Sequence, residues 1–93
     1  MDEKSEIEIV VKIKSHPDLP YILLQISNDP AVPSDAFISS EDSTDGTSEI
    51  KISVEEDPNF CVNSFGFVLA KTVISILFDN GVKIEKISLD ITG

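Results

Sequence analysis

The chain has 93 residues, enough for one domain built from a single sheet and one or two helices. It contains 17 acidic residues and seven lysines, with no arginine, and its formal net charge is −10. Such a chain repels polyanions and lacks the forked guanidinium donor that binds phosphate and guanine, so we expect no direct nucleic-acid ligand. The acidic surface either faces a basic partner or serves only to keep the protein soluble.

The single cysteine, Cys61, excludes an intramolecular disulfide and a cysteine metal cluster. The first residues carry no apolar run of the signal-peptide type. We therefore predict a reducing compartment, the cytoplasm, with the nucleus also open for a eukaryotic protein. Residues 60–78 approach the length of a bilayer span, but Lys71 near their middle opposes insertion by roughly 2.5–3.5 kcal/mol, so we predict no membrane role.

Residues 6–14 predict a half-buried strand, because apolar and charged side chains alternate along them. The apolar face consists of Ile7, Ile9, Val11 and Ile13. The preceding residues, 1–5, are predicted to be disordered.

Residues 18–29 favour a short helix. Asp18 is a candidate cap, Pro20 is tolerated in a first turn, and the Asn-Asp-Pro sequence at 28–30 ends the segment. Four apolar residues recur at the spacing of one helix face, namely Leu19, Ile22, Leu23 and Ile26. A buried strand over residues 21–26 is the alternative, because short apolar runs fit both structures.

Residues 36–39 and 49–55 predict two strands of a hairpin. The second alternates clearly, with Ile50, Ile52 and Val54 on one face. Between the strands, residues 40–48 are polar and acidic, with Asp45-Gly46 as the turn, so we expect a long, mobile tip. The acidic spacing does not match a calcium-binding loop, and we predict no metal site there.

Residues 57–81 predict one long helix, opened by Asp57 and Pro58 and closed by Gly81 as a left-handed cap. At 3.6 residues per turn, its apolar side chains form two stripes on roughly opposite sides. The first stripe contains Cys61, Phe65, Leu69, Thr72 and Ile76. The second contains Phe67, Ala70, Ile74 and Phe78. Because the chain is short, we expect its own sheet to cover one stripe and another polypeptide to cover the other.

Residues 86–92 alternate again and predict a final strand at a sheet edge or paired with a partner chain. The expected fold is therefore α+β: an antiparallel sheet of three to four strands with one short and one long helix on one face. Its order is strand, helix, strand, strand, helix, and then the C-terminal strand. All 93 residues form a single domain.

Sequence motifs for catalysis are absent. His16 is the only histidine, no nucleophile motif surrounds it, and there is no phosphate-binding glycine loop. We expect neither a catalytic activity nor a cofactor. Gly66, inside the long helix, predicts the close approach of another backbone, which fits a helix packed on both sides.

Three stretches resemble the Pcc-type dimerisation subunit of the KEOPS complex, which is related to the cancer/testis antigen family. Residues 7–14 are similar to its first strand, and residues 22–33 to its first helix and the Asn/Asp-Pro connector. Residues 62–74, V-N-S-F-G-F-V-L-A-K-T-V-I, resemble the start of its second helix. Members of that family end with the long helix, whereas this chain continues through residues 82–93.

The resemblance implies a non-catalytic subunit of the machinery that makes threonylcarbamoyladenosine in transfer RNA. It implies a homodimer or a paralogue heterodimer, and helices that pack against the catalytic threonylcarbamoyltransferase subunit. The residues expected to bind a partner are Ile22, Leu23, Ile26, Phe65, Phe67, Leu69, Ile74, Ile76 and Phe78. A second hypothesis is an acidic inhibitor or immunity-type protein that blocks a basic nucleic-acid-binding partner. For that hypothesis, the candidate residues are Glu41, Asp42 and Asp45.

Overall fold

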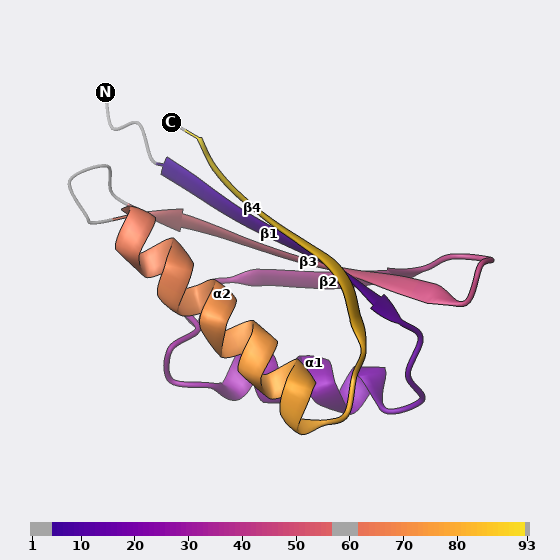
Figure 1. Cartoon of the computed structure of the whole chain (residues 1–93). Coiled ribbons are helices and arrows are strands. Elements are labelled where there is room, and N and C mark those ends of the chain that lie inside the picture. The colour runs from indigo at the N-terminus through magenta and orange to yellow at the C-terminus, as the bar shows by residue number, and fades with distance from the viewer. Residues whose placement is uncertain (1–4, 57–61, 93) are drawn as a thin grey trace.

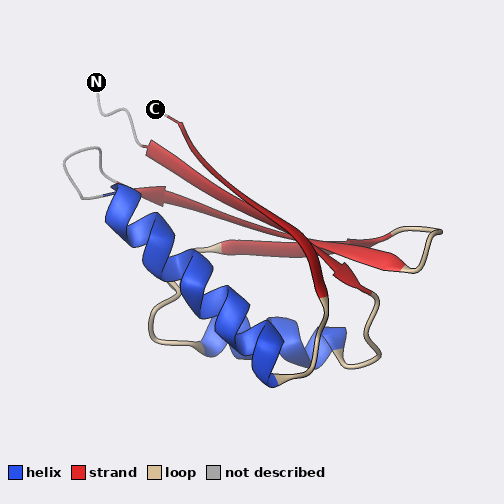
Figure 2. Ribbon diagram, in the orientation of Figure 1, coloured by secondary structure: helices blue, strands red, loops and turns tan. Residues whose placement is uncertain are grey.

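The computed structural model describes residues 5–56 and 62–92, which form a four-stranded antiparallel sheet with two helices on one face (Figures 1 and 2). The elements are β1 (Ser5–Lys14), α1 (Leu19–Asn28), β2 (Phe37–Asp42), β3 (Thr47–Glu56), α2 (Val62–Asp79) and β4 (Ile84–Thr92). The strand order is β2-β3-β1-β4. This confirms the predicted α+β fold. Of the residues predicted to be disordered, 1–4 lie outside the described residues, and Ser5 begins β1.

The core lies between the sheet and the helices, and β1 runs through its centre. Ile7, Ile9, Val11 and Ile13 have no solvent exposure. In the β1–β3 register Ile9 lies opposite Ile52, and in the β1–β4 register it lies opposite Leu89. Because both neighbours are antiparallel and in register, three apolar rows face the helices together.

The helix prediction for α1 is confirmed over the strand alternative. Pro20 lies in its first turn, where a missing N–H leaves no hydrogen bond unmade, and Ile22 and Ile26 are fully buried. The Asp18 side chain makes no capping hydrogen bond, although its carbonyl accepts one from the Ile22 N–H at 2.9 Å.

The hairpin tip is shorter than the sequence predicts. Residues 40–42 belong to β2 and residue 47 begins β3, so the turn spans only residues 43–46. The Ser43 N–H donates to the Thr47 carbonyl at 2.9 Å, and Gly46 has a φ of 83°, which suits glycine. The predicted loop over residues 40–48 is therefore wrong in its bounds. Residues 40–42 are polar because they belong to β2, an exposed edge strand, and not because they lie in a loop.

The C-terminal end of α2 is the predicted glycine cap. Gly81 has a φ of 72°, its N–H donates to the Phe78 carbonyl at 3.0 Å, and the Val82 N–H donates to the Leu77 carbonyl at 3.0 Å. These two bonds define a Schellman motif, and Val82 and Leu77 are both buried beside it. The motif reverses the chain, so that β4 starts only a few residues after the helix. The predicted start of the helix, at Asp57 and Pro58, lies outside the described residues.

Gly66 lets α2 approach β4 closely, but it meets side chains of β4 and not the backbone that the sequence predicted. A Cβ at this position would lie 3.3 Å from Ile91 Cδ1 and 3.5 Å from Leu89 Cδ1. The helix therefore rests directly on the helix-facing side chains of β4.

We expect Gly81→Ala to lower the free energy of unfolding by about 1–2 kcal/mol, because an L-residue is strained at this positive φ. Urea denaturation monitored by circular dichroism would measure the change. Ser75→Ala, at an exposed position in the middle of α2, is the control and should leave stability within about 0.5 kcal/mol. Equal stability of Gly81→Ala and the native chain would contradict the cap.

Candidate protein-binding surface

The buried face of α2 lies between the two predicted stripes. Leu69, Val73 and Leu77 are fully buried against the sheet, with Gly66 and Ala70 beside them. Val73 and Leu77 belonged to neither stripe. The buried face contains Leu69 from the first stripe and Ala70 from the second. The other members of the two stripes therefore lie on the two flanks of this one buried face. Cys61, the first member of the first stripe, lies outside the described residues.

The two flanks of α2 have different neighbours. Ile76 lies on the flank toward α1, where it lines a groove with Tyr21 and Leu24. At 100° per residue, Phe67, Ile74 and Phe78 point to the opposite flank, the one on the β4 side of the helix. In Figure 1 α2 and β4 lie in front, with α1 and β2 behind them.

Two phenylalanines on the β4-side flank are strongly exposed. Phe67 is 69% and Phe78 is 77% exposed, and Ile74 between them is half-buried. Val68, on the solvent side of the helix, is also exposed. We call Phe67, Ile74 and Phe78 the α2 flank. This flank is an apolar surface that the described part of the chain leaves largely uncovered.

The nine residues expected to bind a partner therefore separate into three groups. Ile22, Ile26 and Leu69 have no solvent exposure and belong to the chain's own core, so no partner can contact them in this fold. Leu23, Phe65, Ile74 and Ile76 are half-buried. Phe67 and Phe78 are accessible.

Among the described residues, four exposed apolar side chains were not in the expected set: Tyr21, Leu24, Phe37 and Val68. Tyr21 and Leu24 line a groove of about 490 Å³ between α1 and the end of α2. An Asn80 side-chain N–H donates to Gln25 Oε1 at 2.8 Å and ties these two helices together. A helical projection would have found Tyr21 and Leu24, because they lie opposite the apolar row of α1.

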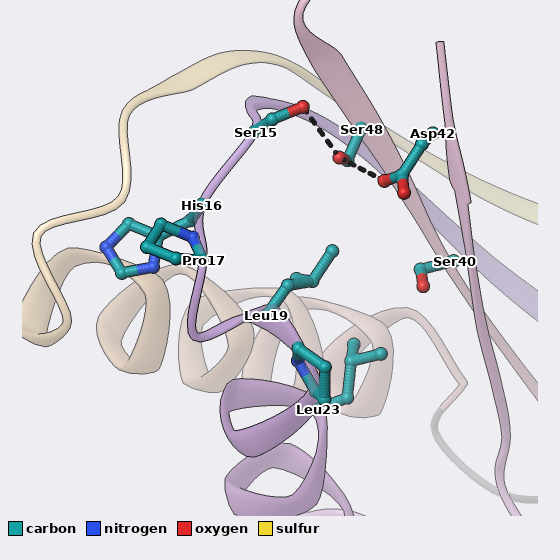
Figure 3. A pocket seen from close by; sticks show the side chains of 9 residues that line it. Ser15, His16, Pro17, Leu19, Leu23, Ser40, Asp42 and Ser48 are labelled. Atoms are coloured by element: carbon teal, nitrogen blue, oxygen red, sulfur yellow. Dashed lines mark hydrogen bonds between the residues drawn. The ribbon is translucent and has the colours of Figure 1, made fainter.

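A cavity of about 690 Å³ lies between the start of α1 and the β2–β3 hairpin (Figure 3). Its floor is apolar, from Leu19 and Leu23. At its upper end Ser48 Oγ donates to Asp42 Oδ1 at 2.7 Å, and Ser15 Oγ lies 3.0 Å from Ser48 Oγ. Since the Ser48 proton points to Asp42, Ser15 is the donor in the second bond.

This cavity holds serine, histidine and aspartate, but not in a catalytic arrangement. The His16 Nδ1 accepts a hydrogen bond from the Asp18 N–H at 3.2 Å. Figure 3 shows the His16 ring on the other side of the backbone from Ser48 and Asp42. Ser48 therefore has a carboxylate as its direct partner and no imidazole base, and the chain of hydrogen bonds links strand ends.

Charge is distributed unevenly along the chain. Residues 62–92 carry three of the seven lysines and three of the 17 acidic residues, so this segment is neutral and the whole −10 lies elsewhere. The charged residues of the neutral segment are Lys71, Asp79, Lys83, Glu85, Lys86 and Asp90. In the β2–β3–β1 part of the sheet, Glu41 lies opposite Glu49 and Glu6 opposite Glu55. Ion pairs join Lys12 to Asp45 at 3.8 Å and Lys51 to Glu8 at 3.5 Å.

The turn of the hairpin perturbs one carboxyl group. The Thr47 hydroxyl donates to Asp45, and so does the Thr47 N–H at 3.2 Å. The side-chain hydrogen bond from Thr47 is the main reason that the pKa of Asp45 is lowered from its ordinary 3.8. Within residues 5–56 and 62–92, no three histidine, cysteine or acidic side chains gather as a metal site.

Comparisons with known proteins identify the fold alone. No family model matches the chain, and no curated protein matches it. The de novo designed protein Foldit4 is similar at a TM-score of 0.68 and 10% identity, over 98% of both chains. A variant of MSL1 from Arabidopsis thaliana, solved by cryo-electron microscopy, is similar at a TM-score of 0.63 and 11% identity. That match covers 90% of this chain and 36% of the MSL1 chain.

These likenesses carry no function, because one fold hosts many. The role suggested by the resemblance to the KEOPS subunit stays a prediction. Neither α1 nor the described part of α2 has the combination of length and hydropathy needed to cross a membrane.

We expect Leu69→Ala and Phe67→Ala to differ in their effect on stability. Leu69→Ala should lower the free energy of unfolding by about 2–5 kcal/mol, because it leaves a cavity in the core. Phe67→Ala should change it by less than about 0.5 kcal/mol, because the ring is mostly in solvent. Urea denaturation of the monomeric chain would measure both. Comparable losses would mean that the α2 flank is covered within the chain itself.

We expect Asp45 to titrate below 3.8 in the folded chain. A carboxyl with a lowered folded pKa stabilises the fold above the unfolded value and loses that contribution as the pH falls through the folded pKa. The loss therefore occurs below pH 3.8. Thr47→Val should move the pKa back up, whereas Thr47→Ser keeps the hydroxyl and should not. Side-chain carboxyl shifts in an NMR titration would give the values, and an unshifted Asp45 in the native chain would contradict the hydrogen bond.

Proposed function

We propose that this chain is a non-catalytic protein-interaction subunit that binds another polypeptide through the α2 flank. The observation that carries the proposal is the exposure of Phe67 and Phe78 on one side of one helix, at 69% and 77%. Fully burying a phenylalanine side chain contributes about 1.5–3 kcal/mol, and aromatic residues often dominate interface energies. Two such rings, about three helical turns apart, suit a partner that lies along the helix.

The electrostatics of the segment support an apolar contact over an ionic one. Residues 62–92 are neutral, so a partner approaching α2 meets little net charge. Lys71 is the single formal charge between Phe67 and Phe78. Binding at this surface therefore rests on apolar burial and should respond weakly to salt.

The finer role that we propose is the one implied by the resemblance in residues 7–14, 22–33 and 62–74. It is a dimerising KEOPS-type subunit in the cytoplasm or nucleus that supports threonylcarbamoyladenosine modification and binds the catalytic threonylcarbamoyltransferase subunit. In this role, α2 contributes the contact and the chain itself carries out no chemistry. The sheet differs from the pattern implied by the resemblance, because β4 lies beside β1 as an additional strand.

A second candidate function is an acidic inhibitor that blocks a basic nucleic-acid-binding protein. It is favoured by the location of the whole −10 charge outside residues 62–92. Glu41 and Glu49 lie opposite one another, and like charges so placed destabilise a sheet by themselves. A basic partner would relieve that repulsion.

The tagged native chain should co-purify a partner from its own host, and mass spectrometry would identify that partner. We expect Phe67→Asp and Phe78→Asp each to remove it. Affinity should fall by about 30-fold or more, which corresponds to 2 kcal/mol at an interface hot spot. Retention should change little between about 0.1 and 0.5 M salt, because the contact is apolar. Ser27→Asp adds the same charge to an exposed position on α1 and is the control.

The two candidate functions give opposite results. For the inhibitor, reversal of Glu41, Asp42 and Asp45 to lysine removes the partner, salt weakens binding steeply, and the phenylalanine variants bind normally. The KEOPS-type role further requires that the captured protein is the threonylcarbamoyltransferase subunit. A partner retained by both phenylalanine variants would refute the α2 flank as the binding surface.

A further inference from the structure

We propose that an extended, lysine- or arginine-containing segment of a partner protein binds at the free edge of β2, antiparallel to β2 and beside α1, as a fifth strand of the sheet. The proposal goes beyond the proposed function, because this site shares no residue with the α2 flank. It also differs from the inhibitor hypothesis, because it requires backbone pairing and a groove as well as charge.

The backbone of β2 directs hydrogen-bonding groups to its free edge. β2 is the first strand in the order β2-β3-β1-β4, so β3 pairs with only one of its sides. The Ser43 N–H donates to the Thr47 carbonyl at 2.9 Å, which makes these two residues a hydrogen-bonded pair. In an antiparallel ladder, hydrogen-bonded and non-hydrogen-bonded pairs alternate. The residues of β2 whose N–H and C=O groups point away from β3 are therefore Ile38, Ser40 and Asp42.

The pairing of β3 with β1 leads to the same assignment. The Ser15 N–H donates to the Gly46 carbonyl at 3.0 Å, so the alternation along β3 can be counted from this end as well. The β3 residues opposite Ile38, Ser40 and Asp42 direct their backbone groups to β1. They cannot also bond to β2, because the N–H and C=O of one strand residue point to the same side.

The side chains of these three β2 residues lie on the helix side of the sheet. Ile38 lies opposite Ile52, and Asp42 lies opposite Ser48. Ile52 and Ser48 are both buried beneath the helices, and directly opposite residues of antiparallel strands share a face. In an added strand, the residues that bond to β2 would therefore place their side chains on the helix side as well, next to α1.

Two cavities lie between β2 and α1 to receive such side chains. The cavity of about 690 Å³ is bordered by Ser40 and Asp42 of β2, with Leu19 and Leu23 of α1 across from them (Figure 3). A second cavity, of about 210 Å³, is lined by Ile38 of β2 and by Pro20, Leu23, Leu24 and Ser27 of α1. Leu23 borders both cavities, so they form one groove along β2. The positions opposite Asp42 and Ile38 are four residues apart, which is about 13 Å along a strand.

The chemistry of the groove differs between its two ends. Asp42 Oδ1 accepts a hydrogen bond from Ser48 Oγ at 2.7 Å, and the other carboxylate oxygen has no hydrogen bond or ion pair with any described residue. No lysine is among the described residues that line this cavity. A lysine or arginine would place its apolar stem along Leu19 and Leu23 and its cation at Asp42. The Ile38 end is mainly apolar and suits an aliphatic side chain.

Charge on β2 restricts which strand can be added. Natural proteins protect exposed strand edges with charged residues, and Glu41 and Asp42 give this edge two carboxylates. They repel an acidic strand, including a second copy of β2, and attract a basic one. Glu41 also lies opposite Glu49, so a basic residue beside Glu41 would relieve a like-charge contact. The chain as a whole, at −10, attracts a basic segment from a distance.

The first test is an N-methyl scan of a synthetic peptide, measured by calorimetry and by amide NMR shifts of the full chain. The probe is an acetylated and amidated seven-residue peptide with lysine second, valine fourth, leucine sixth and threonine elsewhere. It should bind with a Kd below about 1 mM and shift the amides of Ile38, Ser40 and Asp42. N-methylation of the valine, whose N–H would donate to the Ser40 carbonyl, should weaken binding about tenfold or more. N-methylation of the third residue, whose N–H would face solvent, is the matched control and should change affinity less than about twofold.

The second test removes one carboxylate charge at a time. Asp42→Asn keeps an oxygen that accepts from Ser48 and should weaken the lysine peptide about fivefold. Glu49→Gln removes the same charge from the other face of the same hairpin and should have less than about a twofold effect. A peptide with glutamate in place of the lysine should show no binding at about 1 mM. Phe67→Asp, on the α2 flank, should leave the affinity for the lysine peptide unchanged.

Three results would overturn the proposal. No binding of the lysine peptide at about 1 mM would mean that β2 accepts no strand. Full affinity of the peptide N-methylated at valine would mean that the peptide does not pair with the backbone of β2. Equal effects of Asp42→Asn and Glu49→Gln would reduce the interaction to general attraction by the acidic hairpin. If any of these occurs while Phe67→Asp still removes the host partner, the proposed function stands and the β2 site does not.

Discussion

Burial of the β1 side-chain row beneath the two helices is the interaction on which the rest of the structure depends. Ile7, Ile9, Val11 and Ile13 are fully excluded from solvent. At about 1.5–3 kcal/mol for each side chain, this row contributes roughly 6–12 kcal/mol, which is as large as the whole net stability of a typical domain. Every other element is arranged to cover it: β3 and β4 extend it sideways, and α1 and α2 close it from one face. Within residues 5–56 and 62–92, no further helix or strand covers the far flank of α2.

Apolar and charged surfaces are therefore segregated in this molecule. The helix-facing side contains nearly all the large apolar residues of the described chain, and the exposed ones lie on α2, on α1 and, at Phe37, at the start of β2. The carboxylates gather on the opposite face and along the β2–β3 hairpin, where some lie directly opposite each other. Because of this segregation, experiments can separate a contact through α2 from a contact through the acidic hairpin, since salt weakens the acidic contact far more than the apolar one.

Most of the fold was predictable because the sequence alternates cleanly. Strands at residues 6–14, 49–55 and 86–92 were identified from period-two patterns, and the α2 cap from Gly81. The hairpin tip was misjudged because solvent-facing strand residues such as Glu41 and Asp42 have the composition of a loop. Pairing with β3 decides their conformation, and pairing is a long-range property that local composition does not encode.

The candidate surface was only partly predictable for a related reason. Projection of α2 located Phe67, Ile74 and Phe78 on a common side, but it could not tell which arc faces the sheet. Val73 and Leu77 complete the buried arc, and a division of the apolar pattern into two stripes leaves both of them out. Likewise Ile22 and Ile26 were expected at an interface, yet both are buried in the core. The reason is that, among the described elements, α1 covers that part of the sheet. Apolar periodicity reveals which residues share a face and leaves open what that face meets.

The position of β4 beside β1 also has a kinetic consequence. Glu6 pairs with Thr92 and Ile7 with Ile91, so the first and last strands of the described chain are direct neighbours. Their pairing closes a loop that contains every other element, and such distant contacts form only after a large entropy loss. The hairpin and the two helices can form from local contacts, but the sheet is incomplete until both ends meet. The chain should consequently fold more slowly than helical proteins of its length, with docking of β4 among its latest events.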